Sequence, residues 1–442
     1  MNMTSSRPEV SLALVGIGGY GNSYLSTLLK QASEKGLRLS AVVDPSPASC
    51  RHLPEIHRQG IPLYPTLEAL QNRHSCALVI ICTPLHLHCE QTVQALAHAS
   101  HVLCEKPLSS TPAQASEMIH ARDKAQKQVS IGYQWSFSAA IQALKRDIAS
   151  GIFGKPKRLK TLVLWPRDLG YYGRNDWAGK RYSKSGQPIF DNPLNNACAH
   201  HLHNMFYVIG DRLDRSALPA SLTAELYRAN DIETFDTAAV RVWTTGGVEV
   251  LCIVSHATSA EHGPSFIFEF EHATVEFAGE QPTEASSDGA GLIARFADGQ
   301  VKEYGSPERA PDRKLWAAVE SARSNTPTVC GIEAALPHTL VADALNQSAA
   351  NPVEFAASIK HTEQQPNGYH RIWVDGLDDV LLKCFNTGQL PFELKVPWAV
   401  EGVQMRLAEP TICAPESFAE LPRKISERVQ IQPFAAKQHE PV

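Results

Sequence analysis

The first 130 residues alternate short apolar runs with longer segments of helical periodicity, and this alternation restricts the fold more than any other feature. Strands are expected at 10–15, 40–43, 78–82, 101–104 and 129–132. Helices are expected at 20–35, 47–58, 66–71, 89–99 and 111–127. Strands that are apolar along their whole length are buried on both faces, as in parallel sheets covered by helices. The pattern predicts an α/β fold that begins with a doubly wound parallel sheet of the Rossmann type.

A glycine-rich loop directly follows the first of these strands. Gly16 permits a tight turn, Gly18 lets the backbone approach a phosphate, and Gly21 allows the next helix to pack closely on the strand. The N-terminus of that helix offers free N–H groups and a partial positive charge. The loop therefore predicts a dinucleotide site, formed by Gly16, Gly18, Gly19, Tyr20 and Gly21.

Asp44 ends the second expected strand, where a carboxylate can bind the ribose hydroxyls of a dinucleotide. Its charge repels a 2′-phosphate, so it favours NAD over NADP as the cofactor. The alternative is an aspartate that only stabilises the turn before Pro45.

The pattern changes after about residue 133. A helix at 139–150 and a strand at 158–165 lead into a long aromatic loop at 166–193 and a helix at 196–209. Further strands are expected at 220–227, 237–244, 248–256, 266–271, 273–277 and 291–297, and helices at 313–324 and 332–348. We predict a Rossmann domain at 1–132, an α/β domain with a large, mostly antiparallel open sheet at 133–400, and a tail at 401–442.

Charge and cysteine usage exclude several classes of function. The net charge is −5, and no Lys/Arg-rich run offers a surface for nucleic acid. The ten cysteines are scattered without a Cys-x-x-Cys pair, which argues against zinc ribbons and redox dithiols. Residues 1–9 are polar, and the apolar runs are shorter than a membrane span. We expect a cytoplasmic protein without a metal site, a nucleic-acid partner or a membrane segment.

A Glu-Lys-Pro run at 105–107 follows the strand at 101–104, at the edge where ligands of open α/β sheets bind. The glycine loop, Asp44, Thr83, Pro84, His88 and this run follow one another in the order and spacing of a known family. Over about residues 9–400, the chain resembles the Gfo/Idh/MocA oxidoreductases, which include glucose-fructose oxidoreductase and inositol dehydrogenase.

The resemblance implies a catalytic role for Lys106, beside the nicotinamide and hydrogen-bonded to the reacting hydroxyl. An ammonium at that place stabilises a developing alkoxide. The Lys106–Pro107 peptide is then a candidate for the cis form. The resemblance also implies a wider cofactor site that contains Thr83, Pro84, His88, Glu105, Lys106 and Gln134.

A second family signature is an aspartate four residues before a catalytic histidine. By this resemblance His200 takes the acid/base position, and Asn196 stands where the aspartate is expected. Asparagine can orient an imidazole but cannot stabilise imidazolium, so the pKa of His200 should be lower than in relatives that keep the carboxylate. Helical spacing places Asn196, His200, His203 and Asn204 on one face, directed either at a cleft or at solvent. A zinc site at His200, His201 and His203 is disfavoured, because these spacings do not converge.

The loop after residue 165 is rich in aromatic residues, arginine and asparagine, which stack on sugar rings and bind vicinal hydroxyls. It is either a substrate-binding lid or a loop packed by its own aromatics. The predicted substrate-binding residues are Arg167, Tyr172, Arg174, Trp177, Lys180, His203, Asn204 and His256. Arg228 and Asp236 could either form a buried pair or contact substrate.

These features together predict an NAD-dependent oxidoreductase that oxidises a secondary hydroxyl of a sugar, cyclitol or related polyol, or runs the reverse reduction. One alternative is a redox-assisted glycosidase that keeps its NAD through each turnover. Another is a non-catalytic sugar or nucleotide sensor on the same fold. The resemblance also implies a homodimer or homotetramer.

Overall fold

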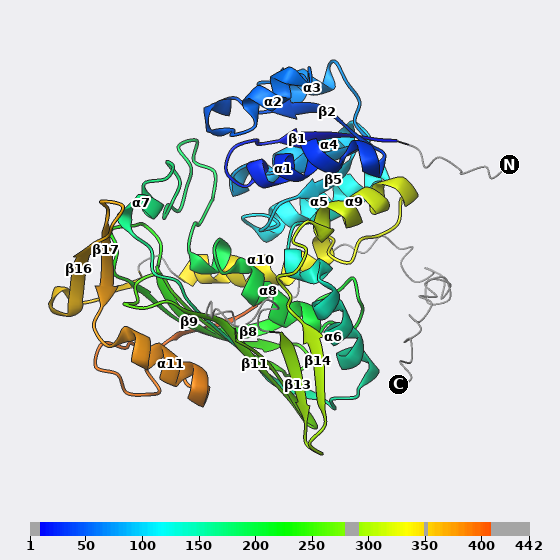
Figure 1. Cartoon of the computed structure of the whole chain (residues 1–442). Coiled ribbons are helices and arrows are strands. Elements are labelled where there is room, and N and C mark those ends of the chain that lie inside the picture. Colours follow the sequence, from blue (N-terminus) through cyan, green and yellow to red (C-terminus); the bar gives the residue numbers. More distant parts are fainter. Residues whose placement is uncertain (1–8, 279–290, 349–351, 408–442) are drawn as a thin grey trace, which may run out of the picture. The chain divides into compact units, whose positions relative to one another are not determined.

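The computed structural model describes residues 9–278, 291–348 and 352–407, which lie within one unit of the chain, Met1–Ala408. They build two large sheets, the first from the N-terminal part and the second from later residues (Figure 1). A separate two-stranded sheet pairs β16 (Lys360–Gln364) with β17 (His370–Val374). No helix in the described ranges is both long and apolar enough to cross a membrane.

Among the described residues, the first sheet has six parallel strands in the order β3-β2-β1-β4-β5-β6. They are β1 (Val10–Val15), β2 (Leu37–Val43), β3 (Leu63–Tyr64), β4 (Leu78–Ile81), β5 (His101–Cys104) and β6 (Val129–Ile131). The strands β4 and β5 are buried at every position, as expected for a sheet with helices on both faces. The predicted Rossmann-type sheet is confirmed. Because the strand order reverses between β1 and β4, a crevice opens at their carboxyl ends.

Helices from two distant parts of the chain cover the first sheet. The connections between its strands contribute α1 (Gly21–Gln31), α2 (Leu53–Arg58), α3 (Leu67–Gln71), α4 (His88–Ala97) and α5 (Pro112–Ala125). A further helix, α9 (Arg313–Ser324), comes from the later residues. Its Leu315, Ala318 and Val319 belong to the same buried core as β1 and α1. The first sheet therefore needs residues far outside its own segment of sequence.

The second sheet joins ten described strands in the order β14-β13-β12-β11-β7-β10-β9-β8-β15, with β18 (Val403–Arg406) also paired to β8. Its other strands are β7 (Pro156–Leu164), β8 (Pro219–Arg228), β9 (Thr237–Thr244), β10 (Glu249–Ser255), β11 (His262–Phe270), β12 (Ala273–Ala278), β13 (Leu292–Phe296), β14 (Val301–Gly305) and β15 (Val353–Glu354). Among these pairs, β7–β10 and β8–β15 are parallel and the others antiparallel. The predicted, mostly antiparallel sheet is confirmed.

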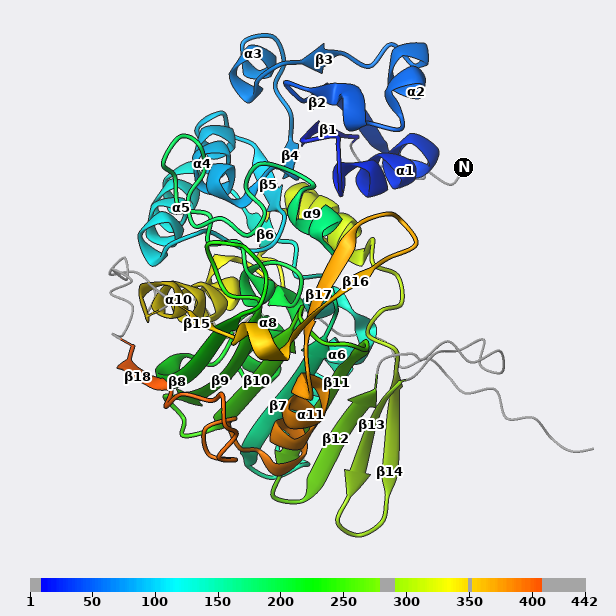
Figure 2. The ribbon, with the colours of Figure 1, turned by 90° about the vertical axis from the view of Figure 1, so that its left-hand side faces the viewer.

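The two faces of the second sheet carry different helices. The face toward the first sheet carries α6 (Ala139–Ser150), α8 (Ala199–Val208) and α10 (Ile332–Ser348) (Figure 1). The opposite face carries α11 (Leu377–Thr387), which shares a buried core with Leu251 of β10. The strands β16 and β17 belong to neither large sheet and lie next to α11 (Figure 1, Figure 2). The helix α8 thus lies between the two sheets, where it can carry side chains toward the crevice.

Two local differences from the sequence-based expectations bear on the site. The helix expected at 196–209 begins only at Ala199, because Pro193–Asn195 (η5) form a separate helical turn before it. The loop expected at 166–193 contains a short helix, α7 (Leu169–Tyr172).

Some described strands and one described helix were not expected. They are β3 in the first sheet and, in later parts of the chain, β14, β15, β16, β17, β18 and α11. The strand β18 lies in the segment expected as a tail, and residues 408–442 of that segment lie outside the described residues. The domain boundaries near residues 132 and 400 stay predictions.

Candidate active site

One large cleft collects many of the residues that the sequence singled out. Its volume is about 1740 Å³, whereas small-molecule sites typically have about 300–1,000 Å³. One wall consists of the loops after β1, β2, β4 and β5, and the other consists of residues from the aromatic loop together with His200. The cleft therefore has room for a dinucleotide and a second ligand.

The glycine loop forms the part of the cleft below the end of β1. Gly16 has a φ of +84°, and a Cβ there would lie 2.8 Å from the carbonyl oxygen of Cys82. A Cβ at Gly18 would lie 2.3 Å from Ser49 Oγ, and one at Gly21 would lie 2.0 Å from the carbonyl oxygen of Gly16. Because α1 has no acidic residue in its first turn, its N-terminal partial charge faces this loop unopposed. The loop residues that line the cleft are Gly16, Gly18, Gly19 and Tyr20.

Asp44 lies at the end of β2, and backbone groups fix its side chain. Its Oδ2 accepts a hydrogen bond from the N–H of Ile17 at 3.0 Å, and its Oδ1 accepts one from the N–H of Ser46 at 2.8 Å. Each carboxylate oxygen keeps a further lone pair for a ligand. Asp44 lines the cleft beside the glycine loop, a position compatible with the predicted ribose contact.

Lys106 follows β5 and connects the two walls of the cleft. Its Nζ donates a hydrogen bond to the carbonyl oxygen of Asn196 at 2.8 Å. Burial lowers the pKa of Lys106, while the charge of Glu105 opposes this and that of Lys314 adds to it. The Lys106–Pro107 peptide is cis, as predicted. The ammonium is therefore held at a defined place in the cleft.

The segment after β4 is joined to the segment after β5 by a buried histidine. The Nε2 of His88 lies 2.9 Å from the carbonyl oxygen of Thr83, and its Nδ1 lies 2.8 Å from that of Pro107. Thr83, Pro84 and His88 all line the cleft. Since both ring nitrogens contact protein carbonyls, His88 braces the cleft wall rather than offering a free polar group.

Glu105 pairs with a lysine that the sequence analysis missed. Its carboxylate accepts hydrogen bonds from Tyr24 Oη at 2.7 Å and from the Nζ of Lys314, which lies on α9. Both members of the ion pair are buried, and Lys314 also lines the cleft. Burial by itself lowers the pKa of Lys314, but the interactions with Glu105 and Tyr20 outweigh it and leave this pKa raised.

His200 lies in the first turn of α8 and lines the cleft. Its Nδ1 is buried and has no hydrogen-bond partner, and the ring of Tyr133 packs edge-on against its ring at 5.8 Å. Burial lowers the pKa of His200 well below its usual value, and the charges of Lys106 and Lys314 lower it further. The imidazole is therefore neutral at pH 7.

Asn196 does not lie on the same helical face as His200, contrary to the prediction. It precedes α8, and its side-chain Nδ2 donates to Oδ1 of Asp191 at 2.7 Å instead of orienting His200. Its contribution to the site is the carbonyl that accepts from Lys106. Asp191, the carboxylate that accepts from this amide, was not singled out from the sequence.

Eight of the predicted ligand-binding residues do not line the cleft. They are Gly21, Gln134, Arg167, Tyr172, Lys180, His203, Asn204 and His256. His203 and Asn204 are buried, and the ring of His203 stacks on Tyr133 at 3.9 Å and hydrogen-bonds Ser136 Oγ at 2.8 Å. The prediction that they face a cleft or solvent is therefore wrong, because this face of α8 packs into the protein.

The other residues in this group contact the protein around them. Lys180 forms an ion pair with Glu233 at 3.1 Å, and the Nδ1 of His256 lies 3.3 Å from Tyr172 Oη. Gln134 begins a short helical turn, Gln134–Phe137. The described residues contain no group of three or more His, Cys, Asp or Glu that could hold a metal ion.

Arg228 and Asp236 form neither of the predicted arrangements. The guanidinium of Arg228 bonds the carbonyl of Ile232 and the carboxylate of Glu354, both at 2.7 Å. Asp236 instead accepts hydrogen bonds from the backbone and side chain of Asn230 at 2.8 Å.

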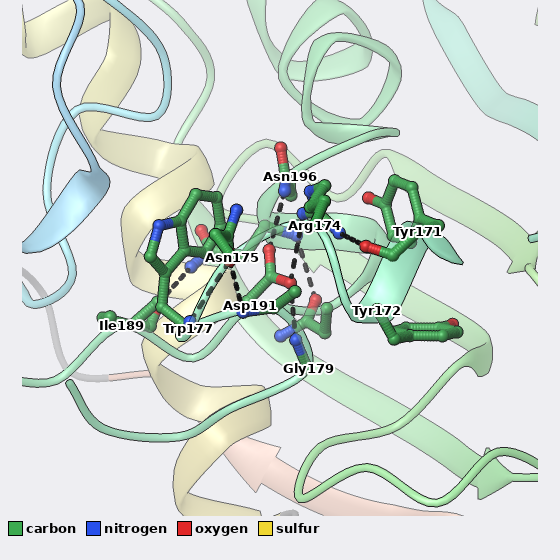
Figure 3. Close-up of polar contacts among 12 residues, drawn as sticks. Tyr171, Tyr172, Arg174, Asn175, Trp177, Gly179, Ile189, Asp191 and Asn196 are labelled. Carbon is green, nitrogen blue, oxygen red and sulfur yellow. Dashed lines mark hydrogen bonds and ion pairs between the residues drawn. The ribbon is translucent and has the colours of Figure 1, made fainter. Parts of the chain in front are cut away.

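Residues of the aromatic loop pack on one another (Figure 3), and several of them line the cleft. The guanidinium of Arg174 lies 3.7 Å from the ring centre of Tyr171 and 5.1 Å from that of Trp177. Asn175 Oδ1 accepts hydrogen bonds from two backbone N–H groups that follow it. Of these cleft residues, Arg174 and Trp177 were predicted, whereas Tyr171 and Asn175 were missed.

Comparison with known families and proteins supports the first sheet as a nucleotide-binding unit. Residues 10–133 match the sequence model of an oxidoreductase family with an NAD-binding Rossmann fold. The chain is 26% identical over 210 residues to D-glucoside 3-dehydrogenase of Escherichia coli (strain K12), covering 47% of the chain and 56% of the relative. It is 24% identical over 312 residues to D-apiose dehydrogenase of Rhizobium rhizogenes, covering 70% and 81%. The chain thus spans about half the length of some curated relatives it matches.

Solved structures extend the likeness in fold over both large sheets. The WlbA dehydrogenase of Bordetella pertussis, solved with NADH and UDP-GlcNAcA, superposes with a TM-score of 0.62 at 19% identity and covers 77% of this chain and 96% of that one. An aldose-aldose oxidoreductase of Caulobacter crescentus gives a TM-score of 0.62 at 19% identity, covering 77% and 97%. At this identity the likeness concerns the fold alone.

Proposed function

The chain belongs to the Gfo/Idh/MocA family of oxidoreductases, and we propose that it is an NAD-dependent dehydrogenase that oxidises a secondary hydroxyl of a sugar, cyclitol or related polyol. The observation that carries this proposal is a single cleft lined by the glycine loop, Lys106 and His200. An ammonium and a neutral imidazole at one place suit the removal of a hydroxyl proton. The relatives named as glucoside and inositol dehydrogenases support this class of substrate.

The residues around the glycine loop fit the dinucleotide. Side chains at Gly16 or Gly18 would collide with the neighbouring loops, so the bare backbone is what forms the cradle. This backbone and the N-terminus of α1 would hold the pyrophosphate, and Asp44 would bind the ribose. NAD, when bound, supplies the acceptor for the hydride that leaves the carbon of the alcohol.

Lys106 would bind the substrate hydroxyl and stabilise the alkoxide as the proton leaves. The carbonyl of Asn196 takes one of its three N–H donors, which leaves donors for a ligand in the cleft. Because this contact fixes the ammonium before substrate arrives, little reorganisation is needed during the reaction.

His200 would accept the hydroxyl proton. The Nδ1 of its ring is buried without a partner, so Nε2 is the nitrogen that can reach a ligand in the cleft. A base must be unprotonated before the reaction, and the lowered pKa of His200 keeps it so. Lys106 would thus stabilise the negative charge of the alkoxide, and His200 would accept the proton.

The acid side of the pH–rate profile should reflect His200. Because burial and the charge of Lys106 hold its pKa well below 6.5, the base stays available as the pH falls through 6.5. We expect kcat/KM for alcohol oxidation to stay nearly constant between pH 8 and pH 6.5 and to fall only at lower pH. His200→Gln should reduce the rate by about 10²–10⁴-fold and abolish this limb. A wild-type inflection at or above pH 6.5 that His200→Gln removes would contradict the lowered pKa.

The choice between NAD and NADP should depend on Asp44. Asp44→Ala removes the charge that repels a 2′-phosphate, so the ratio of kcat/KM for NAD to that for NADP should fall by about 10–100-fold. Steady-state kinetics with both cofactors measure this ratio. Asp44→Asn is the matched variant, because its amide oxygen can still accept from Ile17. An unchanged ratio in both variants would show that Asp44 only stabilises the turn.

Activity assays with a panel of sugars and cyclitols test the proposal as a whole. We expect absorbance of reduced cofactor when purified protein is mixed with NAD and the right polyol. Net cleavage of a glycoside without accumulation of NADH would instead identify the redox-assisted glycosidase. Tight binding of NAD and sugar with neither reaction would favour a sensor.

A further inference from the structure

Asp191 is a buried carboxylate that faces the cleft from the end of the aromatic loop, and its side chain is 5% exposed. Its Oδ2 accepts a hydrogen bond from the N–H of Gly179 at 2.8 Å and lies 3.5 Å from Nη2 of Arg174. Its Oδ1 accepts from Nδ2 of Asn196 at 2.7 Å. Figure 3 shows Asp191 between Arg174 and Asn196, so both carboxylate oxygens have partners.

These contacts continue from Asp191 to the ammonium of Lys106. Asn196 donates its side-chain amide to Asp191 and accepts the Lys106 ammonium on its own backbone carbonyl. The same residue therefore links the carboxylate to the cation. Arg174, Asp191, Asn196 and Lys106 all line the one cleft.

The charges around Asp191 support this arrangement. The pKa of Asp191 is raised, because the effect of burial outweighs the nearby charges of Arg174 and Lys106 and the hydrogen bonds from Gly179 and Asn196. A buried anion with this set of donors stabilises the cations it faces. Removing the anion would leave Arg174 and Lys106 without a shared counter-charge.

We propose that Asp191 is a positioning residue for Lys106: its carboxylate holds the amide of Asn196, and the carbonyl of Asn196 holds the ammonium in the cleft. This inference rests on the proposed dehydrogenase function and deepens it. Asp191 supplies from the loop the negative charge that the family places at position 196. In this chain an aspartate at position 196 would place a second negative charge next to the carboxylate of Asp191, and the two would repel each other.

Substitutions at these two positions test the inference. We expect Asp191→Asn to lower kcat by about 10–100-fold with little change in the KM for NAD. The alkaline limb of the pH profile should shift to lower pH, because Lys106 then keeps the counter-charge of Glu105 but loses that of Asp191, while the like charge of Lys314 remains. Asn196→Asp alone should also lower kcat. The double substitution Asp191→Asn/Asn196→Asp keeps one carboxylate in the pair and should recover kcat to within about 10-fold of wild type.

The matched control is Asp176→Asn in the same loop, because Asp176 is exposed and pairs only with Lys184 at 3.0 Å among the described contacts. It should leave kcat and the pH profile unchanged. The inference is overturned if Asp191→Asn keeps the wild-type kcat and alkaline limb, or if the double variant is no more active than Asp191→Asn.

A second measurement does not depend on turnover. Acetic anhydride labelling of Lys106 at a series of pH values, mapped by mass spectrometry, reports the pKa of its ammonium. A lower pKa in folded Asp191→Asn supports the role of Asp191 even if no polyol is oxidised, and then only the dehydrogenase proposal fails. An unchanged pKa overturns the inference even in an active enzyme.

Discussion

Lys106→Met is expected to lower kcat for polyol oxidation by about 10²–10³-fold while NAD still binds. Methionine matches the length of the lysine stem but has no N–H to stabilise a developing alkoxide. The contact between Lys106 and Asn196 shows that the ammonium occupies a fixed place in the cleft, which is the condition for such a large effect. The glycine loop and Asp44 are untouched, so the dissociation constant of NADH, measured by its fluorescence, should change little.

Two further variants test whether the loss of activity in Lys106→Met comes from the missing ammonium at this position. Lys106→Arg keeps the charge but not the compact ammonium, and it should stay at least about 10-fold below wild type because the guanidinium cannot take the same place. Lys184→Met removes a lysine that is 80% exposed and should have the activity of wild type. If Lys106→Met turned over polyol at the wild-type rate, both the dehydrogenase mechanism and the role of Asp191 would fail.

The part of the site that could be predicted lies next to the carboxyl ends of strands. The glycine loop, Asp44 and the Glu105–Pro107 run each directly follow a short apolar strand. Because parallel strands end at one edge of the sheet, the strand order alone brings these residues together. His200 came from the resemblance to a family, and its place in the cleft depends on how the second sheet positions α8.

Asp191 and Lys314 could not be assigned because their roles arise from contacts that no local pattern records. Asp191 stands in an irregular loop, where hydrogen bonds from Gly179 and Asn196 compensate the burial of its carboxylate. Lys314 meets Glu105 across 209 positions of sequence. One signal was available for Lys314: it stands at i−4 from Ala318 on the apolar side of α9, where a lysine needs a partner.

The predicted polar face of α8 was wrong for a different reason. Spacing shows which residues share a face but not what that face meets. His203 and Asn204 do follow His200 along α8, yet both are buried, and His203 hydrogen-bonds Ser136 in the neighbouring turn. Asn196 is not on the same face as His200, because α8 begins three residues later than expected, after the turn at Pro193–Asn195.

The ion pair between Glu105 and Lys314 leads to the largest expected effect on stability. The two side chains are 10% and 2% exposed. Lys314→Met leaves the carboxylate of Glu105 buried without its counter-charge, and breaking one side of a buried pair costs about 3–5 kcal/mol. Urea unfolding followed by circular dichroism should show this loss as a lower midpoint with an unchanged m-value. Because α9 contacts the first sheet partly through this ion pair, the lost stability comes from the packing between two distant parts of the chain.

The double variant Glu105→Gln/Lys314→Met separates the unpaired charge from the loss of packing. With no buried charge left behind, it should be more stable than Lys314→Met alone, by about 1–3 kcal/mol. Breaking the exposed pair of Arg38 and Glu9, whose side chains are 60% and 58% exposed, with Arg38→Gln should change stability by less than about 1 kcal/mol. If Lys314→Met unfolded at the wild-type urea concentration, the buried pair would not hold α9 to the sheet. If the double variant were no more stable than Lys314→Met, the loss would come from packing around Tyr24 rather than from charge.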